Sequence, residues 1–515
     1  MAARKPRPRA AAPRPIVDEP GSPRLEALFA DLHQRARDLE LYLILRYQAR
    51  VYRGLSLVNG KLEEVTSRRT SGLGMQAFSR DGRSAFAALD RLDPLEARRT
   101  LVALAAGVRE ASRRKLGANR EIFKLKPERL EARPATRYDM AAVSLAEVER
   151  GARGPHDELR ALFPGLKLET MLQASDDEWV VTRSDGAHAA YRMPRTSLVH
   201  HLTLAGAQGA ALTASAAVSS PSYEVIFDGA KTALLAARAQ RAARLLGDLA
   251  QAPHIAAGSY PLVIDYALAK GLAHEAVGHA SESDSYRTSC LARGGRFRRG
   301  DRVAEPGLSV IDEPLLGDHA YQPISPNGVR RLRTAIVEHG VLHQGLSDIF
   351  TARRGGVAMS GAERAEAYSS VPVPRMSNIR IEMDNPVPVT ERFEDLSPDD
   401  LRELLRAAGR LDGRKIAFLS GYRGGQVNTR RGDFVFNCAA VYTISKDAIK
   451  LHKPAIFSGY FLSALGAVKT AFGPLVLDAI GTCGKWGQKV PSSGGSHYFL
   501  YLEPRPDVIL GGRIA

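Results

Sequence analysis

The segment ALAKGLAHEAVGHA, residues 267–280, holds two histidines five residues apart, with a glutamate directly after the first. The imidazole nitrogens of His274 and His279 are good zinc ligands. A carboxylate beside a metal-bound water, here Glu275, can take its proton as general base. Because the metal lowers the pKa of that water to about 7, a nucleophile forms at neutral pH. The segment predicts a hydrolytic metal site; the alternative is a set of polar residues on a surface helix.

The spacing of the two histidines differs from the H-E-x-x-H pattern, in which they lie about 40° apart around a helix and face one metal. A separation of five residues corresponds to a rotation of about 140° around the helix axis, so the two side chains would point away from each other. A one-residue π-bulge would bring His274 and His279 back to one side. A break of the helix at Gly278 would do the same. We expect one of these two distortions.

A catalytic zinc ion usually takes a third protein ligand and keeps one position for water. Cys483 is the best distant candidate, because it stands in the glycine-flanked segment GTCGK, residues 481–485, where the backbone can approach a site closely. Lys485 could stabilise its thiolate. A buried, unreactive thiol is the alternative. We interpret Cys290 and Cys438 as structural.

Four further polar residues are weaker candidates for the site. Glu282 and Asp284 could supply a fourth ligand or accept hydrogen bonds from the ligand histidines, although exposed carboxylates are the favoured interpretation. Arg375 and Asn378 could contact a substrate, or could be structural turn residues, which we favour slightly.

The elements that position these residues follow from the apolar pattern. Apolar residues at three- and four-residue spacings predict helices over Arg24–Arg53, Asp93–Lys115 and Ala230–Leu249. The small-residue stretch Thr203–Ser222 is either a strand pair or a flexible crossing. Short apolar runs punctuated by Gly and Pro predict strands, among them 262–265, 334–337, 379–383, 416–418, 434–436, 440–444, 455–457 and 499–502.

The predicted fold class is therefore α+β. We expect a disordered basic Pro/Arg tail over residues 1–23 and an N-terminal α/β domain with long helices over residues 24–225. A β-rich catalytic domain is expected over residues 226–515.

The cysteine content and the distribution of apolar residues indicate the cellular compartment of this protein. Three widely separated cysteines in 515 residues are no disulfide framework and indicate a reducing compartment, so we expect a cytoplasmic protein. No apolar run is long enough for a transmembrane helix, and the N-terminus lacks the apolar region of a secretory signal. We expect no membrane association.

The net charge of +16 could indicate nucleic-acid binding. Most basic residues are arginines in an Ala/Arg/Gly-rich chain, which favours a GC-rich genome as the cause. The sequence contains no helix-turn-helix signature and no basic stripe interleaved with aromatic residues. Nucleic acid is therefore disfavoured as a partner.

Five ordered blocks between about residues 225 and 490 resemble the TldD/PmbA family of metallopeptidases, on the TldD side. The blocks are HEAVGHASESD (274–284), DEP with VEHGVL (312–314, 337–342), AEAY with PRMSN (365–368, 374–378), GGQV with GDFVF (424–427, 432–436), and GTCGK with GQ (481–485, 487–488). The N-terminal half matches only in general pattern.

The resemblance implies a zinc ion held by His274, His279 and Cys483, with Glu275 as the catalytic base. It implies that this chain is the active subunit of a dimer, formed either with a PmbA/TldE-like partner or with a second copy of the same chain. It also implies a zinc peptidase acting on unfolded or short peptides, modified ribosomal peptides among them, inside an enclosed cavity.

Some residues depart from the family pattern. Thr482 replaces the usual Met, and SSGGSHYFLYLE, with His497, follows Pro491. These departures leave open a metal-dependent amidase of natural-product biosynthesis. A second alternative, from an older family label of gyrase modulator, is a non-catalytic regulator of a DNA-associated enzyme.

Overall fold

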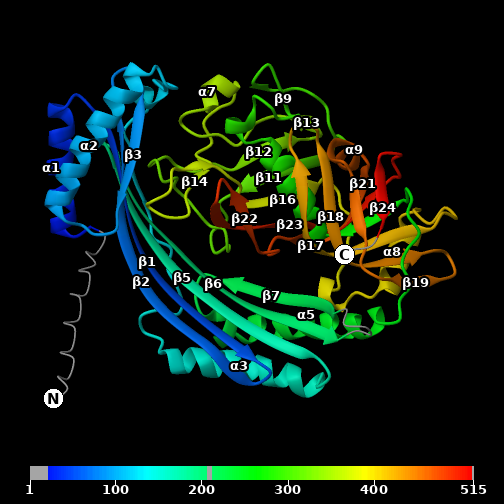
Figure 1. The fold of residues 1–515 in the computed structure, drawn as a ribbon. Helices are drawn as coiled ribbons and strands as arrows, with labels where there is room; N and C mark the ends of the chain where they lie inside the picture. Colours follow the sequence, from blue (N-terminus) through cyan, green and yellow to red (C-terminus); the bar gives the residue numbers. More distant parts are fainter. Residues whose placement is uncertain (1–20, 206–210, 513–515) are drawn as a thin grey trace, which may run out of the picture.

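A computed structural model describes residues 21–205 and 211–512. Almost all of the predicted basic tail lies outside these ranges. The fold is α+β, as predicted, with a long N-terminal sheet carrying helices and a larger mixed sheet in the C-terminal half (Figure 1). Within the described ranges no helix is long and apolar enough to cross a lipid bilayer.

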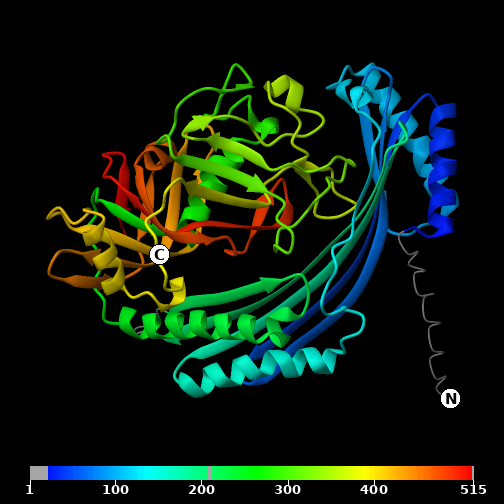
Figure 2. The same cartoon turned by 180° about the vertical axis from the view of Figure 1, so that it is seen from behind.

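The N-terminal sheet has seven strands in the order β3-β2-β1-β5-β6-β4, with β7 also paired to β6. Its strands are β1 (Tyr42–Val58), β2 (Lys61–Phe78), β3 (Ser84–Leu89), β4 (Arg129–Ala132), β5 (Lys167–Arg183), β6 (His188–Ala205) and β7 (Ala211–Ser220). The small-residue stretch is thus a strand pair, β6 and β7; residues 206–210 lie outside the described part. The long strands form a curved sheet whose concave side faces the C-terminal half (Figures 1 and 2).

Helices cover the outer side of this sheet (Figure 2). They are α1 (Pro23–Asp38), α2 (Pro94–Arg113), α3 (Leu145–Leu162), α4 (Glu224–Phe227) and α5 (Gly229–Leu249). Helices α1 and α2 share one apolar cluster with β1 and β2, whereas α3 and α5 share another with β5, β6 and β7. The helices predicted over Asp93–Lys115 and Ala230–Leu249 are confirmed as α2 and α5.

The helix predicted over Arg24–Arg53 is wrong in its second half. Helix α1 ends at Asp38, Glu40 adopts a left-handed backbone with φ of 57°, and the chain turns back as β1. The first part of β1 is buried on both faces, with Leu43 and Leu45 packed under α1 and Ile44 against C-terminal segments. The prediction ran too far because Leu39 and Leu43 continue the three- and four-residue spacing past the end of α1, and no Gly or Pro marks the turn at Glu40.

The C-terminal sheet has thirteen strands, and its main path is β13-β12-β11-β16-β23-β8-β17-β18-β20-β24. β19 pairs with β18, and β21 and β22 pair with β23. The bounds are β8 (Leu262–Asp265), β11 (Leu308–Glu313), β12 (Thr334–Glu338), β13 (Val341–Leu342), β16 (Asn378–Met383), β17 (Ile416–Asn428), β18 (Asp433–Ile444), β19 (Ile449–His452), β20 (Ile456–Tyr460), β21 (Val468–Val476), β22 (Gly481–Lys485), β23 (Gln488–Leu502) and β24 (Val508–Gly511). Two small hairpins are β9 (Ala292–Arg293) with β10 (Arg296–Phe297), and β14 (Glu363–Arg364) with β15 (Val373–Pro374).

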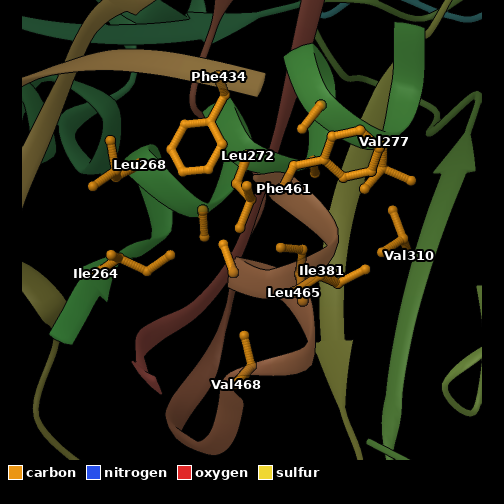
Figure 3. Packing of buried hydrophobic residues seen from close by; sticks show 14 of the residues in the cluster. Ile264, Leu268, Leu272, Val277, Val310, Ile381, Phe434, Phe461, Leu465 and Val468 are labelled. Carbon is orange, nitrogen blue, oxygen red and sulfur yellow. The ribbon is translucent and has the colours of Figure 1, made fainter. Parts of the chain in front are cut away.

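The main apolar core of this half surrounds one helical segment, α6 (Tyr266–Gly271) with the π-helix η3 (Leu272–Gly278) (Figure 3). Leu268, Leu272 and Val277 of this segment pack against Phe434, Phe461 and other residues of the sheet and of helix α9 (Phe461–Gly466) (Figure 3). The remaining short helices are η1 (Glu121–Lys124), η4 (Ser283–Ser285), α7 (Ala352–Gly355), η5 (Phe393–Asp395), α8 (Pro398–Ala407) and α9 (Phe461–Gly466). The segment that carries the two histidines is therefore held in place by the core.

Candidate metal centre

The histidine segment starts at the end of β8. The Asp265 carboxylate accepts hydrogen bonds from the backbone N–H of Leu268 (2.9 Å) and of Gly421 (2.6 Å), so it caps α6 and ties it to β17. From Leu272 the helix widens into η3, and the backbone N–H of His279 donates to the carbonyl of His274. This i→i+5 bond is the π-type distortion that the five-residue spacing predicted.

The π-turn places both imidazoles on one side of the segment. The ring centroids of His274 and His279 lie 5.2 Å apart, with the ring planes at 89°. Gly278 does not break the helix, because His279 keeps a right-handed helical backbone. The glycine is needed for packing instead: a Cβ atom there would lie 2.8 Å from Met376 Sδ.

Cys483 reaches the histidines from the β22–β23 hairpin. Trp486 and Gly487, with φ of 50° and 77°, form its two-residue turn, the left-handed geometry that suits a tight hairpin. The Cys483 side chain is buried, and its Sγ lies 3.6 Å from His279 Nε2. Ligand atoms of His274, His279 and Cys483 all lie within 4.8 Å of one another.

These three residues fit a zinc ion. With a Zn–N distance of about 2.0 Å and a Zn–S distance of about 2.3 Å, a nitrogen and a sulfur ligand at a tetrahedral angle lie roughly 3.5 Å apart. The distance from Cys483 Sγ to His279 Nε2, 3.6 Å, is close to this value. Two imidazoles and a thiolate form a donor set that suits zinc. His274 Nδ1 is buried without a hydrogen-bond partner among the described residues. This nitrogen therefore has no protein group to bind.

Glu275 lies at the edge of this cluster. Its Oε2 is 3.9 Å from His279 Nε2, and its side chain is partly exposed. Burial raises the pKa of Glu275, although His279 and Lys270 act against the rise. A carboxylate so placed, beside the ligand atoms and open to solvent, can exchange a proton with a molecule in the site.

The structure places Glu282 and Asp284 behind His279, and neither is an exposed carboxylate. A hydrogen bond of 3.2 Å joins Glu282 Oε1 to His279 Nδ1. The ammonium of Lys485 donates to both Glu282 and Asp284, at 2.8 Å each. Lys485 is therefore paired with these carboxylates rather than with the thiol. A carboxylate on the second ring nitrogen of a ligand histidine sets the orientation and tautomer of the ring.

Arg375 is the cation that contacts the thiol. It is fully buried, its Nε donates to Cys483 Sγ at 3.3 Å, and its Nη2 donates to the Cys483 carbonyl. Burial acts to raise the pKa of Cys483, but His279 and Arg375 outweigh it, so the pKa falls below its usual value. The chain thus favours the thiolate, the form that binds metal.

Asn378 belongs to a different network. Its Nδ2 donates to Asp318 Oδ2 (3.1 Å), the Leu477 carbonyl (2.9 Å) and Ser493 Oγ (3.3 Å). None of these hydrogen-bond partners is one of the three ligand candidates. The residues that depart from the family pattern also point elsewhere. Thr482 is exposed, and His497 hydrogen-bonds to the backbone of Gly473 and Met383.

Two residues near the centre were missed by sequence reasoning. The Lys270 ammonium is buried, 3.4 Å from Ser492 Oγ, and acts electrostatically on Glu275 and Cys483. Tyr422 packs against Gly271, and burial together with the negative charge of Glu275 raises the pKa of the Tyr422 hydroxyl. Both line a cavity of about 620 Å³ between the two sheets. Lys270, one helical turn before His274, could have been found from its spacing; Tyr422 has no local signal.

Comparison with known proteins gives matches over both halves. Residues 257–478 match the family described as PmbA/TldA metallopeptidase C-terminal domain, and residues 45–112 match PmbA/TldA metallopeptidase domain 1. Together the two segments make up more than half of the chain. Cys483 lies just beyond the longer one.

Three individual proteins illustrate the similarity. A metalloprotease of Methanothermobacter thermautotrophicus is 34% identical over 47% of this chain and 48% of its own length. A zinc metalloprotease TldD homolog of Saccharolobus solfataricus is 26% identical over 47% of this chain and 50% of its own length. The matched part thus spans about half the length of these relatives. The crystal structure of TldE from Thermococcus kodakarensis superposes with a TM-score of 0.71 at 13% identity, over 94% of this chain and 100% of that one. At this identity the superposition shows a common fold.

Proposed function

This chain belongs to the PmbA/TldD metallopeptidase family, and on that premise we propose that it is a zinc peptidase with His274, His279 and Cys483 as ligands and Glu275 as general base. The observation that carries the proposal is the meeting of the three ligand atoms within 4.8 Å, with the Glu275 carboxylate beside them. A zinc ion bound there supplies Lewis acidity, which lowers the pKa of a water molecule and polarises a peptide carbonyl.

The protein side chains handle the proton and hold the ligands. Glu275 takes the proton from the attacking water and returns it to the leaving amine nitrogen. Glu282 orients His279 through Nδ1, and Arg375 holds Cys483 through its thiol and its carbonyl. The proposed substrates are short or unfolded peptides, modified ribosomal peptides among them.

The proposed assembly is a dimer that encloses the site, with a PmbA/TldE-like chain or a second copy as partner. The fold shared with TldE supports a partner of that type.

The test is Glu275→Gln, which keeps the size of the side chain and removes its basicity. We expect unchanged zinc content by metal analysis and a loss of peptide cleavage of about 10²-fold or more. Cleavage at the wild-type rate by a zinc-loaded variant would refute Glu275 as the base. Absence of zinc in the wild-type chain purified with and without a partner would refute the metal site itself.

A further inference from the structure

A cavity of about 360 Å³ lies between the concave face of the N-terminal sheet and the C-terminal half. Its floor consists of residues of β1, β5 and β6 that project from the same side of the sheet, among them Trp179 and Arg195. The opposite wall includes the β22–β23 hairpin, which faces the concave side of the long strands in both views (Figures 1 and 2). Thr482 of this hairpin lines the cavity and directly precedes Cys483. The cavity therefore borders the candidate metal centre.

Arg195 is a buried cation in the floor of this cavity. It lies on β6 opposite Ser175 of β5 and is 8% exposed. Its guanidinium donates no hydrogen bond to any residue in the described part of the chain, and its contact with Asp177, at 3.7 Å, is too long to be one. Because buried N–H groups without acceptors are costly, Arg195 has donors available for a ligand.

Asp177 is already held by a different arginine. Arg50 donates to it from Nε and, at 3.2 Å, from Nη2. Removal of Arg195 would therefore leave Asp177 paired. Asp177 also limits the charge of a ligand at Arg195, because a carboxylate so close repels a phosphate dianion more strongly than a monoanion.

The walls of the cavity carry an excess of positive charge. Burial, with Arg195, Arg364 and Lys270 nearby, lowers the pKa of the His319 imidazole to about 3, so His319 is neutral at pH 7. Trp179 Nε1 is buried and has no acceptor among the described residues. The cavity thus offers donors and cations to a single negative charge. Four cationic residues line it against two acidic ones: Arg50, Arg195, Arg364 and Lys489 against Asp177 and Glu366.

We propose that this cavity binds a carboxylate of the peptide substrate, held by the guanidinium of Arg195. The planar fork of N–H groups on an arginine matches the two oxygens of a carboxylate. The group is either the free C-terminus of the peptide or an acidic side chain, which have the same chemistry. Arg195 is then a specificity-determining residue, and this inference rests on the proposed function in so far as the ligand is a substrate.

Binding can be measured without cleavage, because Trp179 lines the cavity and is one of two tryptophans in the chain. Trp486→Phe leaves Trp179 as the single indole fluorophore. The probes are N-acetyl-trialanine, its C-terminal amide, and the amide of N-acetyl-Ala-Glu-Ala. We expect trialanine or the glutamate peptide to bind at least about tenfold more tightly than the trialanine amide, as charge-assisted hydrogen bonds predict. Which of the two does so identifies the C-terminus or a side chain as the source of the carboxylate.

Two variants in this background test Arg195 in different ways. Arg195→Met removes the guanidinium and should abolish the preference for the carboxylate. Ser175→Asp keeps Arg195 but places a carboxylate directly opposite it on the same face of the sheet, within reach at about 5 Å between Cβ atoms. It should abolish the preference as well, even if Arg195→Met fails to fold. Circular dichroism checks the fold of each variant.

Arg192→Met is the matched control. Arg192 also lies on β6 and also pairs with an aspartate of β5, Asp176, but it projects from the opposite face of the sheet. This variant should keep the full preference for the carboxylate. Arg195→Lys, which keeps the charge and loses the planar fork, should retain part of it.

Cleavage supplies an independent measurement. For a peptide that the wild type cleaves, the form with the carboxylate should have a KM about tenfold or more below that of the uncharged form, and Arg195→Met should raise only the lower value. Equal affinities for charged and uncharged probes would overturn the proposal, and so would a preference that survives in Arg195→Met. Because the metal-free chain serves for the binding experiment, a chain that binds the carboxylate without cleaving peptides would contradict the proposed function alone. Cleavage without the preference would contradict only the carboxylate site.

Discussion

His279 Nε2 lies 3.6 Å from Cys483 Sγ, although 204 residues separate the two along the chain. The histidine is held by a π-turn in the main core and the cysteine by a hairpin at the edge of the sheet. The contact exists only when β23, which pairs with both β8 and β22, has formed. The proposed metal binding would therefore be coupled to the folding of the whole C-terminal half.

Cys483→Ala should lose zinc. The variant removes the only sulfur atom of the cluster and leaves two imidazoles, fewer than the three protein ligands of a typical catalytic zinc site. Metal content per chain after dialysis is the measurement, and Cys290→Ala, at a half-buried thiol outside the cluster, is the matched control. Full zinc occupancy in Cys483→Ala would show that the thiol is not a ligand.

Glu282→Gln should weaken zinc binding by about 10- to 100-fold without changing the ligand set. The amide keeps the shape of the side chain but loses the negative charge that His279 Nδ1 and Lys485 face. Competition with a chelator of known affinity measures the change. Glu391→Gln, at an exposed carboxylate, should bind zinc like the wild type, and equal affinities for all three proteins would contradict the role of Glu282.

Glu363→Gln should change how stability depends on pH. Glu363 is fully buried, its Oε1 accepts from the backbone N–H of Ile349 at 2.8 Å, and its Oε2 has no partner. Burial, with Asp348 nearby, raises its pKa from 4.5 to about 7. The folded state therefore holds a proton that the unfolded chain releases above pH 4.5.

The stability that this proton contributes is present below about pH 4.5 and is lost as the pH rises through about 7. The shift corresponds to about 3 kcal/mol. Because glutamine does not ionise, the free energy of unfolding of Glu363→Gln should rise relative to that of the wild type by most of this amount between pH 5 and 8. Urea unfolding of both proteins across this pH range measures the difference. A difference between the two proteins that stays constant with pH would show that Glu363 is not protonated in the fold.

The local spacing of apolar residues was enough to predict many of the helices and strands. The amphipathic periods of α2 and α5 and the short apolar run of β8 are visible in the sequence because each element buries one side or one short stretch. The same method failed at β1, where α1 and α2 cover one face and C-terminal residues the other. Leu39 and Leu43 continue the helical spacing of α1 into the strand, so the local pattern does not mark the boundary between the two elements.

The sequence by itself determined the chemistry available: two imidazoles, a carboxylate and a thiol, and a helix that had to be distorted for His274 and His279 to share a metal. Covalent spacing and helix geometry are local and so can be read from residue order. Only the tertiary structure decided that Arg375 rather than Lys485 contacts Cys483 and that Lys485 joins Glu282 to Asp284. These depend on which strands become neighbours, a matter of long-range packing that no short window of sequence contains.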